Sequence, residues 1–179
     1  MLQKNEKVDS ILMLSLKLLL GISVTIGLTG YCFQDQIIEW RYEITGQELH
    51  HSAKAFGYLM LSFIAISITY IFGTLLTAKG ALKHLNVMAL FGVIINIVLN
   101  FIMIPESGAE GAALASLITQ TLTALFQLVI AIKLLRISFV KKDKISFSLF
   151  FILSIAMLLL VPLLSFAWFI SLFITFSVL

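Results

Sequence analysis

The chain is divided into long apolar stretches separated by short polar segments. The apolar stretches cover residues 10–33, 52–78, 85–104, 110–135 and 146–179. A helix that crosses a bilayer needs about 20 predominantly apolar residues, so each of the first four stretches is long enough for one crossing. The last stretch is too long for one crossing and contains Pro162, which favours a break. We therefore expect a fifth helix at 146–164 and a sixth at 166–179, the latter too short to cross completely.

The composition agrees with a chain surrounded by lipid. Hydrophobic residues make up 60% of the sequence and charged residues 12%, whereas a soluble domain carries about 25% charged residues. So few charges cannot cover the surface of a water-soluble protein, but lipid replaces water around an apolar exterior. These features predict an all-α, polytopic membrane protein with about six transmembrane helices, in which residues 1–179 form a single transmembrane unit.

Several other classes of protein are disfavoured by the sequence. The basic residues sit in short clusters between apolar stretches and never line one face of a soluble element, so nucleic acid is not expected as a partner. Cys32 is the single cysteine, which excludes an intrachain disulfide and a cysteine-based metal cluster. No metal-ligand spacing, phosphate-binding glycine loop or nucleophile motif is present. We therefore expect neither an enzyme nor a bound cofactor or metal.

The basic residues also indicate how the chain is oriented in the membrane. When the polar segments are numbered alternately, one side carries Lys4, Lys7, Lys79, Lys83, Arg136, Lys141, Lys142 and Lys144. The other side carries Arg41, with Lys54 just inside the following helix. Segments rich in Lys and Arg remain in the cytoplasm. We expect a multi-pass protein of the inner (cytoplasmic) membrane whose N-terminus is cytoplasmic.

A stripe of polar side chains runs along the stretch 110–135. Its members recur at spacings of three and four residues and so share one helix face: Ser116, Thr119, Gln120, Thr123 and Gln127. Such a stripe cannot face lipid. It either holds helices together through hydrogen bonds or lines a wet cavity, and the sequence leaves both readings open.

The stretch 85–104 carries a similar stripe of small and amide side chains. Ala89, Gly92, Asn96 and Asn100 lie on one face. The small residues permit close helix approach, and the amides can bond across an interface. Two asparagines one turn apart exceed what packing alone requires, so these amides are candidates both for packing and for lining a cavity.

Three groups of charged or titratable residues lie within or beside the spans. Lys17 lies about two turns inside the first span, where it either extends its long stem to the headgroups or faces a cavity as a buried cation. Lys54 is expected to be a solvated lysine at the outer end of the span 52–78. His50 and His51 adjoin Glu48, but adjacent residues on a helix point in different directions, so no catalytic cluster is expected. The candidate residues for a substrate cavity are thus Lys17, Asn96, Asn100, Gln120 and Gln127.

The segment NIVLNFIMIPESGAEGAALASLIT at 96–119 resembles the C-terminal half of the lipid-linked oligosaccharide flippases, the polysaccharide-biosynthesis transporters of the multidrug/oligosaccharidyl-lipid/polysaccharide exporter superfamily. The matching residues are Asn96, Asn100, Pro105, Gly108, Gly111, Ala112 and Ala113. Further matches upstream are Gly73, Leu75, Ala78 and Lys79, the polar stretch near Tyr42 and the run Ala53 to Leu61. The resemblance covers roughly residues 10–135. Its pattern describes a helical hairpin, in which Pro105 stops one helix and Gly108 permits the turn.

The resemblance implies a transporter rather than an enzyme. Flippases of this kind have twelve or more helices in two similar lobes, so this chain would supply one lobe and would need a second, in the same longer chain or in a partner. The expected substrate is a polyprenyl-pyrophosphate-linked oligosaccharide carried across the membrane by rocking of the lobes. The central cavity of the family is typically cationic, and Lys17 is the candidate for that role here.

Other functions remain open at the level of the sequence. A multidrug or toxin cation antiporter of the same superfamily would favour a carboxylate inside a span, whereas the acidic residues here lie in loops or at helix ends. A membrane glycan polymerase or ligase would require a larger outer loop with several acids and arginines than residues 34–51 provide. A nonfunctional fragment of a longer protein is the remaining alternative.

The orientation can be tested by labelling introduced cysteines in intact cells. In a Cys32→Ser background, we expect Gln47→Cys to react with a membrane-impermeant thiol reagent and Lys142→Cys to react only after the cells are opened, because lysines segregate to the cytoplasmic side. Labelling of position 142 in intact cells would overturn the proposed topology.

Overall fold

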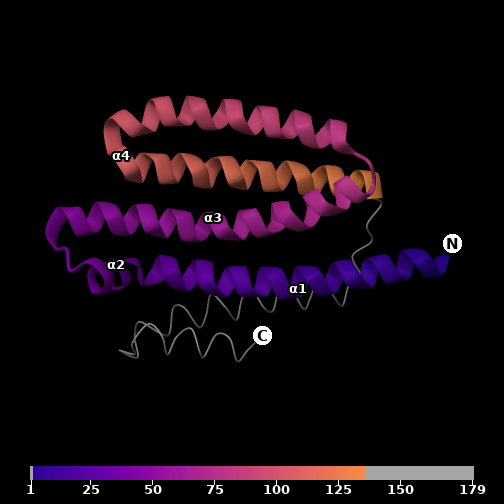
Figure 1. Cartoon of the computed structure of the whole chain (residues 1–179), viewed down its shortest axis with the longest axis horizontal. Coiled ribbons are helices and arrows are strands. Elements are labelled where there is room, and N and C mark those ends of the chain that lie inside the picture. Colours follow the sequence, from indigo (N-terminus) through magenta and orange to yellow (C-terminus); the bar gives the residue numbers. More distant parts are fainter. Residues whose placement is uncertain (1, 136–179) are drawn as a thin grey trace.

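The computed structural model describes residues 2–135, and this part of the chain contains helices and their connections without any strand (Figure 1). The helices are α1 (Leu2–Cys32), α2 (Gln34–Tyr42), α3 (Gly46–Ala78) and α4 (Leu82–Leu135). The expected helices at 146–164 and 166–179 lie outside the described residues. The all-helical character is therefore confirmed for the described part, while the count of about six spans stays a prediction.

Three segments of the described part are long and apolar enough to cross a membrane: Met13–Cys32, Gly46–Ala78 and Leu82–Leu134. The last has 53 residues. A straight helix of that length would extend roughly 80 Å at about 1.5 Å per residue, far beyond the roughly 30 Å hydrocarbon core. The helix is not straight, and its bend decides how the rest of the chain packs.

The bend in α4 lies at Gly108, which has φ 55° and ψ −125°. Glycine lacks a Cβ and adopts positive φ without strain, so the chain reverses there. The first arm (residues 82–107) and the second arm (residues 109–135) run antiparallel (Figure 1). Just after the turn, Gly111 approaches the backbone carbonyl of Met103 so closely that a Cβ at this position would overlap it.

The hairpin expected around Pro105 and Gly108 is thus present, but the prediction that Pro105 stops the helix was wrong. Pro105 lies inside α4, and the helical conformation continues to the turn at Gly108. Proline removes one backbone donor and clashes with the preceding turn. Near the end of a helix, a proline costs only one backbone hydrogen bond. The chain therefore reverses at Gly108, the residue that tolerates positive φ.

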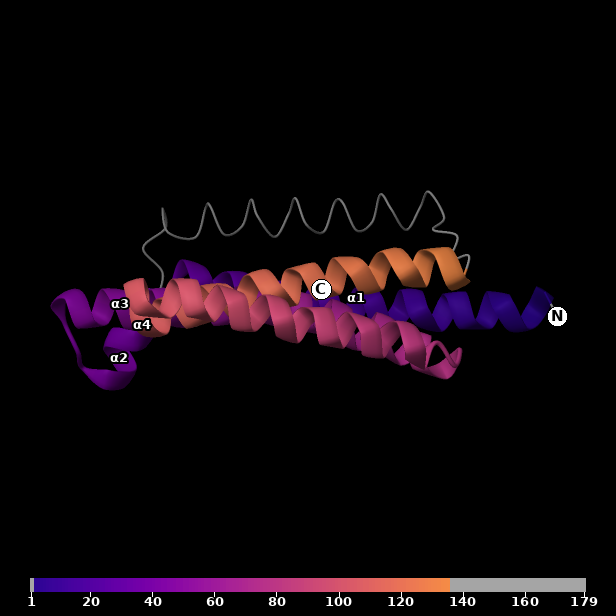
Figure 2. The same ribbon diagram turned by 90° about the horizontal axis from the view of Figure 1, so that it is seen from above.

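The long helices lie side by side, with α3 between α1 and the second arm of α4 (Figure 1). Seen from above, they form a thin layer from which α2 projects (Figure 2). Helices α1 and α3 come close where small residues face Met60. A Cβ on Gly27 would lie 2.8 Å from the Met60 carbonyl oxygen, and one on Gly30 would lie 2.5 Å from Met60 Cγ. The absent side chains allow this close approach.

A buried apolar cluster joins the helices near the end expected to be cytoplasmic. Its members come from α1, α3 and both arms of α4: Met13, Leu16, Ile71, Phe72, Leu76, Met88 and Ala131. The connection between α3 and α4 lies beside it and is closed by Gly80, whose φ is 76°. Removal of these side chains from contact with solvent or lipid fixes the positions of the helices at this end.

The polar segment 34–51 differs from the loop expected there. Residues 34–42 form α2, which ends where Glu43 takes a left-handed conformation with φ 55° and its N–H bonds to the Glu39 carbonyl. Helix α3 begins at Gly46, ahead of the apolar stretch expected from residue 52. Polar residues have adequate helix propensity, so these helices extend past the apolar residues by which the spans were recognised. Helix α1 likewise begins at Leu2 rather than at residue 10.

Candidate functional site

The polar stripes of the two arms of α4 face each other across the hairpin. Asn100 Nδ2 donates a hydrogen bond to Asn96 Oδ1 at 2.9 Å, and Asn96 Nδ2 donates to Thr119 Oγ1 at 3.4 Å. The two arms touch again where Gly92 meets Thr123, whose Oγ1 would lie 3.2 Å from a Cβ on Gly92. Both contacts follow one antiparallel register, so the stripes lie between the arms.

The hydroxyl groups in this stripe bond first to their own helix. Thr119 Oγ1 donates to the Ala115 carbonyl at 2.8 Å, and Thr123 Oγ1 donates to the Thr119 carbonyl at 2.8 Å. Such bonds to the preceding turn satisfy the hydroxyl without a partner helix. Thr119 then still accepts the bond from Asn96, which gives the two arms a side-chain hydrogen bond in addition to their packing contacts.

The asparagine pair retains unused hydrogen-bonding capacity. Asn100 Oδ1 has no hydrogen-bond partner among the described residues. The same side chain lines a groove on the first arm with Ile97, Phe101, Ile104 and Pro105. A bare amide oxygen in apolar surroundings is costly unless a donor reaches it. This oxygen is itself buried, so a donor from a substrate or from another helix would reach it only after the Asn100 side chain turns toward the groove.

Gln127 lies at a second interface, between α3 and the second arm of α4. Its side chain is buried, and its Oε1 faces Gly73, where a Cβ would lie 3.2 Å away. This oxygen also has no hydrogen-bond partner within the described part of the chain. Gln127 thus sits among packed helices and is distant in sequence and position from the Asn96 and Asn100 pair.

The other candidate residues do not join this group. Gln120 is half-buried on the second arm. Lys17 lies on the exposed side of α1, and α3 separates α1 from the second arm of α4 (Figure 1). Asn96 and Asn100 therefore form one site with Thr119, whereas Lys17 and Gln127 occupy separate positions in the described part of the chain.

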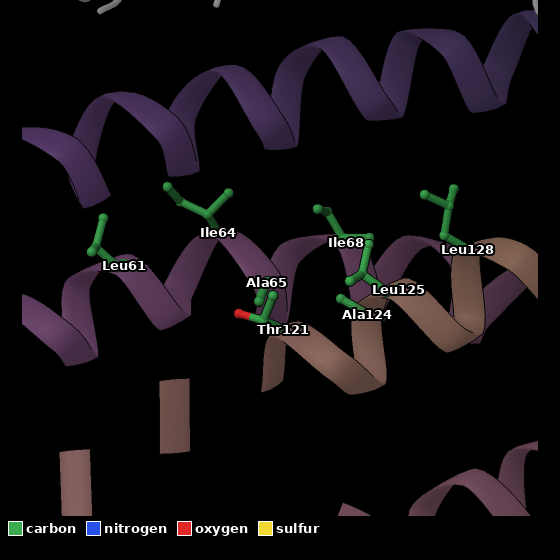
Figure 3. Close-up of a pocket in the computed structure, with 8 residues that line it drawn as sticks. All are labelled: Leu61, Ile64, Ala65, Ile68, Thr121, Ala124, Leu125 and Leu128. Atoms are coloured by element: carbon green, nitrogen blue, oxygen red, sulfur yellow. The ribbon is translucent and has the colours of Figure 1, made fainter. Parts of the chain in front are cut away.

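A groove between α3 and the second arm of α4 contains none of the candidate residues. Figure 3 shows its lining from the two helices: Leu61, Ile64, Ala65, Ile68, Thr121, Ala124, Leu125 and Leu128. Thr121 alone contributes a polar side chain to this lining. The groove therefore offers apolar contact and little hydrogen bonding, which suits a lipid chain or another apolar helix face better than a sugar.

The structure also shows a charged cluster that the sequence did not suggest. Glu110, beside the turn of α4, lies 3.0 Å from His51 Nδ1 through Oε2 and 3.4 Å from Lys54 Nζ through Oε1. The Glu110 side chain is 15% exposed, compared with 63% for His51 and 38% for Lys54. Lys54 keeps part of its side chain exposed, as expected at the end of a span, but its ion pair with Glu110 was not expected, because the hairpin turn brings that carboxylate to the N-terminal end of α3.

The expected topology, in which successive spans run in alternating directions, already contained a hint of this cluster. Lys54 begins one span and Glu110 begins another that runs in the same direction, so both were assigned to the same side of the membrane. Pairing them required knowing that α3 packs against the second arm of α4, which the sequence does not state. No group of three or more His, Cys, Asp or Glu residues suited to hold a metal lies within the described residues.

The cluster can be tested by reversing its charges. We expect Glu110→Lys to lower the apparent melting temperature of the purified protein in detergent, because it places a third basic side chain beside His51 and Lys54. Adding Lys54→Glu should restore part of the loss, since exposed pairs are worth roughly 0.2–1 kcal/mol. Glu106→Lys, an exposed acid just before the turn, is the matched control. Equal effects of the changes at positions 106 and 110 would contradict a specific ion pair.

Comparison with known proteins bears on the transporter interpretation. A family model described as MatE matches residues 3–102, which is more than half of the chain's 179 residues. No curated protein and no solved structure matches the chain. The match covers α1, α2, α3 and most of the first arm of α4. The protein therefore belongs to the MatE family of membrane transporters, within the multidrug/oligosaccharidyl-lipid/polysaccharide exporter superfamily.

Proposed function

We propose that this chain is one lobe of a flippase that moves lipid-linked oligosaccharide across the cytoplasmic membrane for polysaccharide biosynthesis. Membership of the MatE family supports membrane export and leaves the cargo open. The resemblance of residues 96–119 to the oligosaccharide flippases favours a glycan. The cargo would be a polyprenyl-pyrophosphate-linked oligosaccharide, and a second transmembrane lobe would complete the path.

One observation carries the proposal: the polar groups in the middle of the hairpin of α4 are uncharged. Asn96, Asn100 and Thr119 supply amide and hydroxyl groups, whereas the nearest acids, Glu106 and Glu110, lie at the turn. Sugar hydroxyls are recognised by such neutral donors and acceptors. An antiporter coupled to protons or sodium would favour a carboxylate within a span, and none lies in the middle of a described span.

The first arm of α4 exposes an apolar face that either a second lobe or lipid would have to cover. Its large apolar side chains include Leu90, Phe91, Ile94 and Phe101, the last 79% exposed. Asn100 opens onto the groove beside Phe101. A second lobe placed against this arm would enclose that amide, and rocking of two lobes would open it alternately to the two sides.

Lys17 gives the sharpest test of the proposed cargo. A cation in the substrate path would attract the lipid pyrophosphate. For this attraction, the positive charge of the side chain at position 17 matters more than its shape. In proteoliposomes that hold the full chain with its second lobe, we expect Lys17→Arg to keep most flipping of a fluorescent lipid-linked oligosaccharide. Lys17→Gln should lose roughly tenfold or more, because a hydrogen bond to a charged group contributes about 1.5–3 kcal/mol.

As a control, both Lys17 variants should insert into the membrane as well as the unaltered protein. Lys17 lies on the exposed side of α1, so neither change disturbs the buried cluster around Leu16. Full flipping by Lys17→Gln would remove Lys17 from the substrate path. Efflux of a cationic dye driven by a proton or sodium gradient, without flipping of the oligosaccharide lipid, would replace the flippase proposal with the antiporter.

A further inference from the structure

We propose that α2 is an interfacial helix that docks on the outer lipid surface, with Trp40 seated among the headgroups. The proposal concerns a surface outside the candidate substrate site and does not depend on the cargo. It rests on where the fold places α2, on which of its side chains are exposed, and on the charge around them.

The fold fixes the height of α2 relative to the membrane. The apolar span of α1 ends at Cys32, and α2 begins at Gln34 after a break at Phe33, where φ is −111° and ψ is 23°. The Gln34 side chain packs against Gly57 of α3. Helix α2 therefore starts level with Gly57, at the point where the first span runs out of apolar residues.

The charged cluster marks the same boundary independently. Lys54 precedes Gly57 by three residues, which is about 4.5 Å along a helix axis. Lys54 and His51 both contact Glu110 beside the hairpin turn. Charged side chains of this kind belong at or outside the edge of the hydrocarbon core. The start of α2 thus lies within about one helical turn of the charged layer.

The orientation of α2 suits an interface more than a span. The helix projects out of the layer formed by the long helices (Figure 2). Its Ile38 is buried against the protein, while Trp40, two positions further along and therefore on the opposite side of the helix, is 65% exposed. Arg41 lies over the Tyr42 ring, with its guanidinium carbon 5.3 Å from the ring centroid. Trp and Tyr are enriched at membrane interfaces because their rings are amphipathic.

The charges of α2 indicate which lipid headgroups it would meet. Asp35, Glu39 and Glu43 outnumber Arg41 on this helix and its C-cap. A basic amphipathic helix is attracted to anionic lipids, but this acidic segment gains nothing from them. The partner is therefore a zwitterionic lipid surface, engaged through the Trp40 ring and not through charge attraction.

The two tryptophans of the chain make a direct experiment possible. With Trp168→Phe, Trp40 is the remaining tryptophan. The full protein is reconstituted in phosphatidylcholine vesicles whose acyl chains are brominated either near the glycerol backbone or near the chain ends. We expect Trp40 emission to be blue-shifted and quenched most by the lipids brominated near the backbone. Replacing a third of the lipid with phosphatidylglycerol should give no further blue shift.

A matched variant supplies the control. Gln47 is exposed near the start of α3, beyond the charged cluster. In a Trp40→Phe, Trp168→Phe background, the emission of Gln47→Trp should therefore be quenched by aqueous iodide and not by brominated lipid. Circular dichroism confirms that each variant is folded. The proposal is overturned if Trp40 shows the same quenching by iodide and by brominated lipid as the Gln47→Trp variant. It is also overturned if bromines near the chain ends quench Trp40 most, or if its emission shifts further to the blue with anionic lipid.

Discussion

The close antiparallel packing of the two arms of α4 is the constraint on which the rest of the described structure depends. It requires Gly108 to adopt positive φ and Gly111 to lie against the Met103 backbone. Once the arms are paired, Asn96 lies opposite Thr119 and Gly92 lies opposite Thr123. The polar stripes are thereby removed from lipid, and the large apolar side chains of the first arm are left on the outside.

The same turn organises the neighbouring end of the helical layer. It carries Glu110 to the end of α3, where His51 and Lys54 meet it. Because Gln34 at the start of α2 packs on Gly57, about one helical turn along α3 from Lys54, α2 leaves the long helices close to this charged layer. At the opposite end, Leu16, Phe72 and Met88 belong to the apolar cluster that joins α1, α3 and α4. The described helices are therefore joined by apolar packing at one end and by a charged cluster at the other.

Much of this fold follows from the sequence, because apolar length and the position of glycine are local signals. The long apolar helices and the hairpin near Gly108 are of this kind. Helix α2 was missed because a short polar helix has no apolar period to reveal it. The Glu110 cluster was missed because it depends on which helices are neighbours. The amides at Asn96 and Asn100 were recognised as a stripe, whereas their separation from Lys17 became visible only when α3 was placed between α1 and the second arm.

The register of the hairpin is tested most directly by forming a disulfide across it. The test uses a Cys32→Ser background with the pair Gly92→Cys and Thr123→Cys. A Cβ at position 92 would lie 3.2 Å from Thr123 Oγ1. The pair is therefore close enough for a disulfide, which needs Cβ atoms about 3.5–4.5 Å apart. Mild oxidation of the membrane-embedded protein should cross-link this pair rapidly, as seen by mass spectrometry of proteolytic fragments. The pair Gly92→Cys and Leu125→Cys should stay reduced, because Leu125 is 52% exposed on another side of the second arm. Cross-linking of positions 92 and 125 that matches or exceeds that of 92 and 123 would contradict the paired stripes and the site built on them.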